Sequence, residues 1–229
     1  MPGPRAPTGG PPTRAPGIGG SPGRDTPPDD DDCLLHRVDP GKASHTLRGN
    51  IARNCVETEC LAIESAVGDE EGPVEIQVEG DLREGQGSGT ANIVADDSDY
   101  ACERIPLQLT TLDALAASSA LPTGCSVVKI DTDGYDLKVL QGGRGFVGTE
   151  RPVVFGEFLA HCMRWHHQGL AEVVSQRDSL GYAVWQRLPG GWSFTRGVDE
   201  RIYEQDLLLV PREKEGRFEW CLSGREVGR

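Results

Sequence analysis

The segment 127–143, VVKIDTDGYDLKVLQGG, constrains the fold of this chain more than any other part of its sequence. Its apolar start belongs to a run, CSVVKID at 125–131, with little alternation between apolar and polar residues. Such a run favours a strand covered on both faces, as in the centre of a parallel sheet. The following residues place Leu137 and Leu140 on one side and end in glycines, which predicts a short helix directly after the strand.

From residue 33 onward, strand patterns and amphipathic helix patterns follow one another. This alternation predicts an open, mostly parallel α/β sheet with helices on both faces. Thr110 or Thr111 is expected to cap the helix that begins nearby. Strands are expected at 33–39, 60–67, 73–80, 125–131, 151–158, 182–188, 192–196 and 206–213, helices at 43–54, within 107–119, at 134–143 and at 169–181, and a loop at 81–104.

Composition divides the chain into three parts. Residues 1–32 are dominated by Pro, Gly and Arg and have almost nothing to bury, so they are expected to be disordered. Residues 33–213 are expected to form one domain with its own core, and residues 214–229 a C-terminal tail. The formal net charge of −13 argues against binding to nucleic acid or to an anionic membrane, and leaves room for a small ligand in a pocket.

The seven cysteines are odd in number and contain no C-x-x-C pair. A disulfide framework is not expected at this chain length, so the cysteines are interpreted as reduced thiols of a cytoplasmic protein. No apolar run approaches the roughly 20 residues that a membrane span needs, and the N-terminus lacks the apolar core of a secretory signal.

Three expected strands end in acidic residues: Asp39, Asp131 with Asp133 close behind, and Glu157. In an open α/β sheet, ligands bind beyond the carboxyl ends of the strands, so these carboxylates are expected along one rim. A carboxylate such as that of Asp39 can accept two hydrogen bonds from the diol of a ribose. Structural roles also stay open: helix capping for the two central acids, a turn before Pro40, and a plain rim charge for the last.

Several short motifs surround these acids in a definite order. A strand ending in K-I-D is followed by x-D-G and an acidic helix with V-L-x-G, and the next strand begins with R-P. The motifs are RVDP (37–40), NIARN (50–54), AVGDEEG (66–72), TTLDAL (110–115), VVKIDTDGYDLKVLQGG (127–143) and RPVVFGEF (151–158).

Together these motifs resemble those of the FkbM-type S-adenosylmethionine-dependent methyltransferases. The resemblance implies a Rossmann-like sheet and O-methylation of a hydroxyl group, often on a sugar or a polyketide-like metabolite. It implies that Asp39 holds the ribose of S-adenosylmethionine and that Asp69 lies near its adenine. Asp131 would lie beside the amino acid part and the methyl donor, and Asp133 and Glu157 would face the acceptor.

The implied chemistry asks little of the protein, because the sulfonium of S-adenosylmethionine already activates the methyl group. The protein has to align an acceptor hydroxyl with the methyl carbon, and a carboxylate within hydrogen-bond reach can take the hydroxyl proton. Asp131 or Asp133 is the expected base. His161, also expected on the substrate side, or the pair His166–His167 could serve instead. No metal site is expected, because these histidines lack a spacing that sets two ligands on one helical face.

The resemblance covers residues 33–212 but lacks the family's first motif, D-x-G-x-N-x-G after a strand, where glycine lets the backbone approach the ligand. The glycines of APGIGGSPG at 15–23 follow no apolar strand, and nearby prolines forbid the next helix. The chain is therefore expected to lack the first strand–loop–helix unit and to be poorly soluble or weakly active as encoded. A gene-model error at the 5′ end, a degenerate relative, and a partner that supplies the missing unit stay open as explanations.

Two other functions stay open. The DTD at 131–133 can be a D-x-D motif that holds Mn²⁺ or Mg²⁺ against a nucleotide diphosphate, as in a metal-dependent glycosyltransferase. The missing glycine loop favours a non-catalytic, methyltransferase-like scaffold. The identity of the small-molecule hydroxyl acceptor and the oligomeric state are open.

Overall fold

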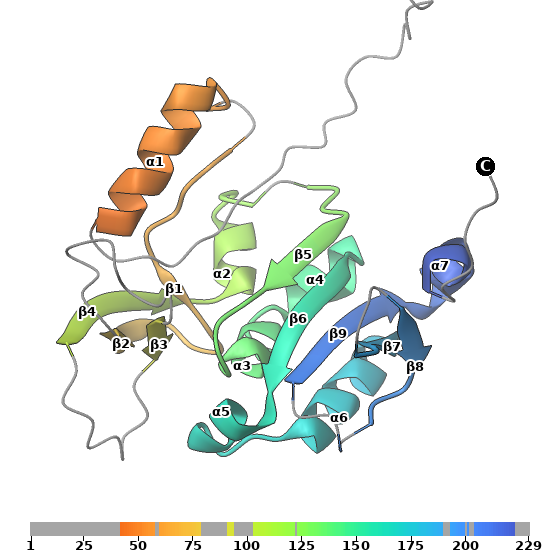
Figure 1. The fold of residues 1–229 in the computed structure, drawn as a ribbon. Coiled ribbons are helices and arrows are strands. Elements are labelled where there is room, and N and C mark those ends of the chain that lie inside the picture. The colour runs from red at the N-terminus through yellow and green to blue at the C-terminus, as the bar shows by residue number, and fades with distance from the viewer. Residues whose placement is uncertain are drawn as a thin grey trace, which may run out of the picture. The chain divides into compact units, whose positions relative to one another are not determined.

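A computed structural model of the chain shows a mixed α/β fold (Figure 1). The strand expected at 33–39, with Asp39, lies outside the described residues, and so does the segment 1–32 that was expected to be disordered. The structure describes residues 42–57, 60–78, 91–93, 103–121, 123–189, 193–199, 201 and 204–222.

Helices and strands follow one another along the chain as short elements. None of the described helices combines the length and hydropathy that a membrane span requires. The helices are α1 (Lys42–Asn54), α2 (Leu112–Ala117), α3 (Asp136–Gln141), α4 (Arg144–Glu150), α5 (Ala160–Trp165), α6 (Leu170–Leu180), the 3₁₀ turn η1 (Arg212–Lys214) and α7 (Glu215–Leu222). The strands are β1 (Ala66–Val67), β2 (Gly72–Val78), β3 (Ala91–Ile93), β4 (Glu103–Thr110), β5 (Val127–Ile130), β6 (Val153–Leu159), β7 (Tyr182–Arg187), β8 (Phe194–Arg196) and β9 (Glu204–Pro211).

Most of the expected elements are present, with changed lengths. The helices expected at 43–54 and 169–181 form as α1 and α6, and the strands expected at 182–188 and 192–196 form as the antiparallel pair β7 and β8. The strand expected at 60–67 is reduced to the two residues of β1, and the loop expected at 81–104 contains β3. The segment expected as a C-terminal tail from residue 214 contains α7.

The described strands form two sheets, whereas the sequence predicts one. The first has the strand order β1-β4-β2-β3 and the second has the order β5-β6-β9-β7-β8. The expected parallel character applies only to the β1–β4 and β5–β6 pairs among the described pairings; the others are antiparallel. The reason lies in the connections, because β2 turns back along β4, and β9 returns between β6 and β7.

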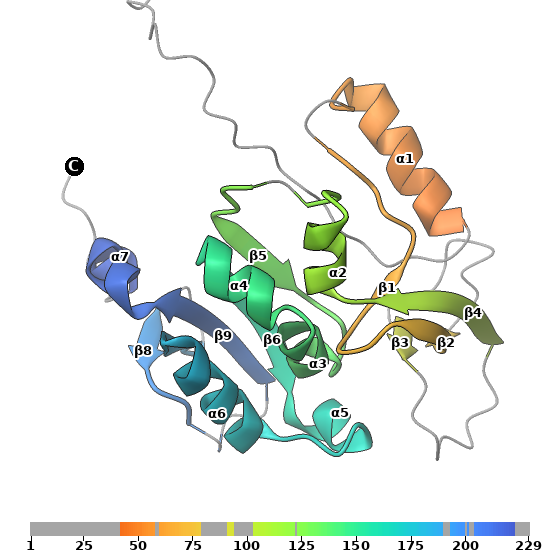
Figure 2. The same ribbon diagram turned by 180° about the vertical axis from the view of Figure 1, so that it is seen from behind.

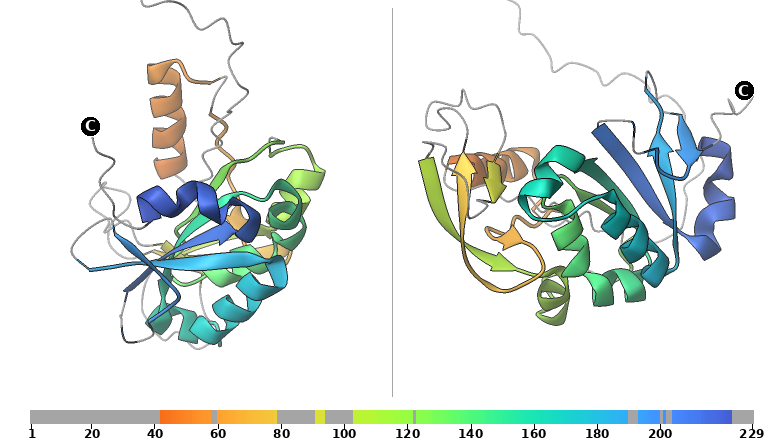
Figure 3. Two further views of the ribbon diagram at one scale, coloured as in Figure 1. Left: turned by 90° about the vertical axis from the view of Figure 1, so that its right-hand side faces the viewer. Right: turned by 90° about the horizontal axis from the view of Figure 1, so that it is seen from below.

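The main core lies between one face of the second sheet and the helices α2, α3, α4 and α6, which stand in front of that sheet in Figure 2. Leu137, Phe146 and Val173 of these helices pack against Val154 and Leu207 of the strands. The opposite face of this sheet is covered at one end by α7, whose Phe218 belongs to a second apolar cluster. Figure 3 shows α6 and α7 on opposite sides of the strands β7 and β9.

The strand β5 corrects one expectation from the sequence. The apolar run 125–131 predicts a central strand covered on both faces, but β5 pairs with β6 and has no second neighbour among the described strands. Val127 at its start is 64% exposed, and only Ile130 of the strand is fully buried. The described elements therefore bury less of this apolar run than the sequence pattern predicts.

Side chains at the start of α2 fix the beginnings of two helices. The hydroxyl oxygen of Thr111 accepts a hydrogen bond from the Ala114 N–H at 3.0 Å, which confirms one of the two N-caps expected for this helix. The carboxylate of Asp113 accepts hydrogen bonds from the N–H groups of Gly145 at 3.0 Å and Phe146 at 2.7 Å. Because those N–H groups belong to the first turn of α4, Asp113 joins α4 to α2.

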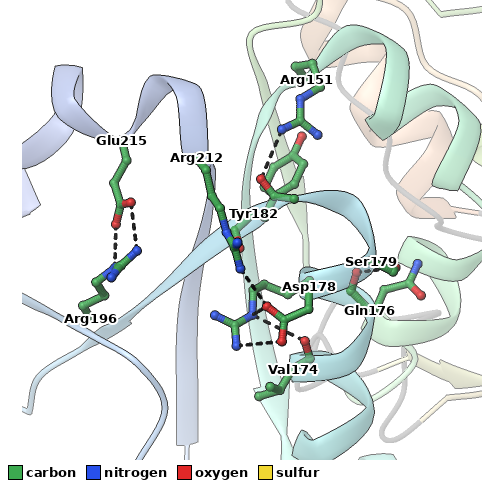
Figure 4. Close-up of polar contacts among 11 residues, drawn as sticks. Arg151, Val174, Gln176, Asp178, Ser179, Tyr182, Arg196, Arg212 and Glu215 are labelled. Carbon is green, nitrogen blue, oxygen red and sulfur yellow. Dashed lines mark hydrogen bonds and ion pairs between the residues drawn. The ribbon is translucent and has the colours of Figure 1, made fainter.

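Arg151 connects the end of α4 to the C-terminal strands. It has a left-handed backbone conformation with φ of 55°, and its guanidinium lies 4.6 Å from the centre of the Tyr182 ring (Figure 4). The guanidinium donates to the carbonyl oxygens of Leu180 at 2.6 Å and Gly181 at 3.2 Å, and to both oxygens of Glu213 at 2.7 and 2.8 Å. This set of contacts holds η1 and the start of β7 against α4, at the end of the sheet away from the acidic rim.

Candidate functional site

The carboxyl ends of β5 and β6 lie next to each other. The two strands are parallel, and Ile130 pairs with Gly156, so the next residues, Asp131 and Glu157, come at the same level of the sheet. The Asp131 carboxylate is about half exposed and forms an ion pair with the ammonium of Lys129 at 2.5 Å. An exposed pair of this kind contributes little to stability, so Asp131 is available to a ligand at low energetic cost.

Glu157 lies opposite a second carboxylate. In the antiparallel pairing of β6 with β9, Glu157 faces Asp206 directly, and both side chains point to the same face of the sheet. The Asp206 carboxylate is mostly buried and forms an ion pair with the guanidinium of Arg187 at 2.5 Å. Arg187 thus offsets one of two adjacent negative charges. This row of charged side chains depends on strand register, which the sequence patterns do not reveal.

The turn between β5 and α3 has an unusual backbone. Asp133 has a φ of 50° and Gly134 a φ of 107°, so two consecutive residues have positive φ values. A Cβ atom at Gly134 would overlap the Cβ and the backbone of Cys162, which means that the turn lies directly against α5. Glycine is required here both by its φ and by this close approach.

Asp136, the first residue of α3, is completely buried behind this turn. One carboxylate oxygen, Oδ2, accepts a hydrogen bond from the Gly134 N–H at 3.1 Å. The other oxygen, Oδ1, makes no hydrogen bond to any described residue. The hydroxyl of Thr132 makes none to a described residue either, but the Thr132 side chain is close enough to Asp136 to lower its pKa. Burial is the larger effect, and it raises the pKa of the Asp136 carboxyl to about 6.

Cys162 is the point at which several predicted site residues meet. Its Sγ lies 3.1 Å from Nε2 of His161. The pKa of the buried thiol is raised by burial first, and then by the negative charges of Asp133, Asp136 and Glu157. The turn after β5, the end of β6 and the beginning of α5 therefore bring Asp133, Glu157 and His161 around one small region.

Asp69 forms the other side of the rim. It follows β1, and its Oδ2 accepts a hydrogen bond from the Lys138 ammonium of α3 at 2.6 Å. The pKa of the Tyr135 hydroxyl is raised to about 12, by burial first and then by the charges of Asp69 and Glu70. The rings of Tyr135 and His166 lie edge to face, with centres 4.8 Å apart. Tyr135 thus contacts the Asp69 side, while its neighbour Gly134 contacts Cys162 on the other side.

A backbone contact fixes the position of the Asp69 turn. Gly142 at the end of α3 lies so close to Gly68 that a Cβ at position 142 would collide with the Gly68 carbonyl oxygen. The ion pair of Asp69 with Lys138 lies next to this contact. Because a backbone oxygen cannot rotate away as a side chain can, the space between α3 and the β1 turn excludes any residue larger than glycine.

The structure thus brings Asp69 near Tyr135 and Lys138, and Asp133 and Glu157 near His161. Asp131 lies on the same rim but pairs with Lys129. The roles predicted for these residues stay predictions, and Asp39 lies outside the described residues. Sequence reasoning missed Lys138 and Asp206 as partners, and no local signal could have linked Lys138 to Asp69, which lies 69 residues earlier. Among described residues, no three His, Cys, Asp or Glu side chains come together as metal ligands.

The family model of the methyltransferase FkbM domain matches residues 23–182, which is more than half of the chain. The chain belongs to the FkbM methyltransferase family. The family match begins inside the segment expected to be disordered and ends at Tyr182, before β9.

A solved relative of this family is similar in structure to the chain. The crystal structure of the methyltransferase FkbM from Methylobacillus flagellatus matches with 10% sequence identity and a TM-score of 0.43. The match covers 78% of this chain and 36% of that chain, so this chain corresponds to about a third of the longer protein. No protein of curated function matches the sequence.

Replacing Gly142 by Ala is expected to lower the free energy of unfolding by about 2 to 3 kcal/mol, because the new methyl group has to displace the Gly68 backbone. Gly148 in α4 provides a matched control, since a Cβ at that position has nothing within 4 Å. Gly148→Ala should be neutral or stabilise the chain by up to about 1 kcal/mol through helix propensity. Urea unfolding of both variants measures the difference, and equal effects would contradict the close contact.

Replacing Asp136 by Asn is expected to remove a pH dependence of the unfolding free energy. The carboxyl has a pKa of about 6 in the folded chain, against an ordinary value of 3.8, so ionisation is penalised in the folded state. Relative to the variant, the wild type should lose on the order of 3 kcal/mol as the pH rises from about 4 to about 6. Urea unfolding across this range measures the difference between the two proteins. A difference that stays constant with pH would show that the carboxyl titrates normally.

Proposed function

We propose that this chain is an S-adenosylmethionine-dependent methyltransferase that O-methylates a hydroxyl group of a sugar or another small metabolite. Membership of the FkbM methyltransferase family supports the reaction type. The acidic rim of β1, β5 and β6 supports the position of the site. We also propose that the complete sheet is Rossmann-like and that β5, β6, β9 and β7 form one half of it.

The observation that carries the proposal is the double contact of the turn after β5. On one side Tyr135 lies beside Asp69, which follows β1, and on the other side Gly134 lies against Cys162 of α5. Residues that are more than 60 positions apart in the sequence therefore lie on both sides of one short turn. A cofactor and an acceptor need this kind of arrangement, because the reacting atoms have to be held together from two sides.

The residues that are present suit S-adenosylmethionine in their chemistry. Oδ1 of Asp69 is buried and makes no hydrogen bond to a described residue, so it can accept one from an N–H or O–H group of a ligand. The carboxylate of Asp131 carries the charge that complements a sulfonium and an ammonium group. Bound S-adenosylmethionine supplies the activated methyl group. Asp39 is assigned to the ribose by the family resemblance.

In this proposal the chain's own side chains bind the acceptor and take its proton. Asp133 accepts the proton of the acceptor hydroxyl, while Asp131 lies nearer the cofactor. Glu157 and His161 orient the acceptor from the β6 and α5 side, where both lie near Cys162.

The described thiols of Cys55, Cys60, Cys125 and Cys162 are free, which supports a cytoplasmic location.

Binding of the cofactor is tested first, by calorimetry of the wild-type chain with S-adenosylmethionine and with S-adenosylhomocysteine. Asp69→Asn is expected to weaken binding about tenfold or more, because it removes one charge beside the ligand. Glu75→Gln is the matched control, since Glu75 of β2 is exposed and pairs with Arg104 of β4. A wild-type chain that binds neither compound would overturn the enzyme proposal and favour a non-catalytic scaffold.

Replacing Asp133 by Asn is expected to lower the turnover number by about 10² to 10⁴, the usual effect of losing a general base. The affinity for S-adenosylhomocysteine should stay within about twofold of the wild-type value, because the amide keeps the size of the side chain. Transfer of radiolabelled methyl groups to a panel of polyhydroxylated small molecules measures turnover. Unchanged turnover in this variant would exclude Asp133 as the base.

A further inference from the structure

Asp136 is a charged residue in the candidate site that no proposed step uses. Its side chain is 0% exposed, so neither the cofactor nor the acceptor can touch it. Burying a carboxylate is costly unless it makes hydrogen bonds that the structure needs. The bond that it makes is specific: Oδ2 accepts from the N–H of Gly134, two residues earlier, in the turn that carries Asp133.

The turn needs such an anchor because its backbone is strained. A positive φ at Asp133 costs energy in a residue with a side chain, and it persists only when the surroundings enforce it. Two contacts enforce the turn. Gly134 abuts Cys162 on the α5 side, and its N–H is bound to Asp136 on the inner side. The turn therefore cannot move toward α5, and the hydrogen bond prevents it from moving outward.

We propose that Asp136 is a positioning residue, which fixes the turn 131–135 and thereby directs Asp133 toward the β6 and α5 side of the site. This inference rests on the proposed function for the role of Asp133, but the fixing of the turn can be tested without it. Negative charges face Cys162 from the turn after β5, from α3 and from β6. Asp133, Asp136 and Glu157 of these three elements each raise the pKa of its thiol.

The thiol of Cys162 reports on the turn directly. Cys162 is 4% exposed and lies under Gly134, so iodoacetamide can reach it only when the turn opens. Asp136→Ala is expected to raise the alkylation rate of Cys162 in the native protein about tenfold, because the Gly134 N–H loses its acceptor. Asp136→Asn keeps an acceptor oxygen but removes the same negative charge, so it measures how far the lowered pKa of the thiol alone raises the rate, and it should stay well below the rate of Asp136→Ala. Mass spectrometry of the Cys162 peptide measures both rates.

Asp113→Ala is the matched control, because Asp113 is also a carboxylate that accepts backbone N–H groups, at the start of α4. It should lower stability without changing the alkylation of Cys162. The proposal would be overturned if Cys162 of Asp136→Ala were alkylated as slowly as in the wild type. It would also be overturned if Cys162 of Asp113→Ala were alkylated as fast as in Asp136→Ala. If Asp136→Ala does not fold, the Gly134 amide of the wild type decides the question by NMR hydrogen exchange. Slow exchange is expected, and exchange at the rate of an unstructured amide would overturn the anchor.

The link to Asp133 is tested by a double-mutant cycle on methyl transfer. Asp136→Ala and Asp133→Asn should each lower the turnover number, and the double variant should be no slower than Asp133→Asn alone. If the loss of turnover in the double variant equalled the product of the two single losses, Asp136 would act independently of Asp133, and the positioning role would be overturned. A wild type that transfers no methyl group refutes the proposed function instead, while the alkylation and exchange results still decide whether Asp136 fixes the turn.

Discussion

The contact between Gly142 and Gly68 is the constraint on which the arrangement of the site depends. It brings the backbone at the end of α3 against the backbone after β1 with no side chain between them. Once this contact is made, Lys138 is in place to pair with Asp69, and Tyr135 lies on the same side. The two described sheets are then connected through α3, because Val67 of β1 and Leu137 of α3 share one core with the strands of the second sheet.

Buried charge is distributed unevenly around this contact. Asp136 is inside the protein with one bonded oxygen, whereas Asp131 is at the surface with a lysine partner. The two carboxylates are separated by a single tight turn, yet the Asp136 carboxylate is buried and the Asp131 carboxylate is exposed to water. A rim built in this way separates the groups that shape the backbone from the groups that can meet a ligand.

Much of this arrangement could be predicted from the sequence, because it is encoded locally. The run before Asp131 and the spacing of Leu137 and Leu140 gave a strand followed by a helix, and Thr111 gave a helix start; all three are present. The motifs around the acids also pointed to the family that the comparisons show. These features depend on residues that are neighbours in the chain, which is the range over which patterns of polarity are informative.

The rest could not be predicted because it depends on tertiary partners. The short helices α4 and α5 have few residues over which a periodic pattern can be recognised, and α4 begins at an acceptor supplied by Asp113 of another helix. The apolar run of β5 indicated a central strand because a sequence pattern cannot show whether a neighbour is present. The pairing of Glu157 with Asp206 follows from register, and register has no signature in either strand alone.

The edge of β5 that lacks a partner among the described strands has a consequence for the behaviour of the molecule in concentrated solution. Among the described strands only β6 pairs with it, so the amide and carbonyl groups along its other edge have no partner strand in the described part of the chain. Backbone groups of this kind pair readily with an extended segment of any neighbouring molecule, at a rate that rises with the square of protein concentration. The exposed ion pair of Lys129 with Asp131 disfavours such pairing, because two molecules that met along this edge would have to remove these charged groups from water.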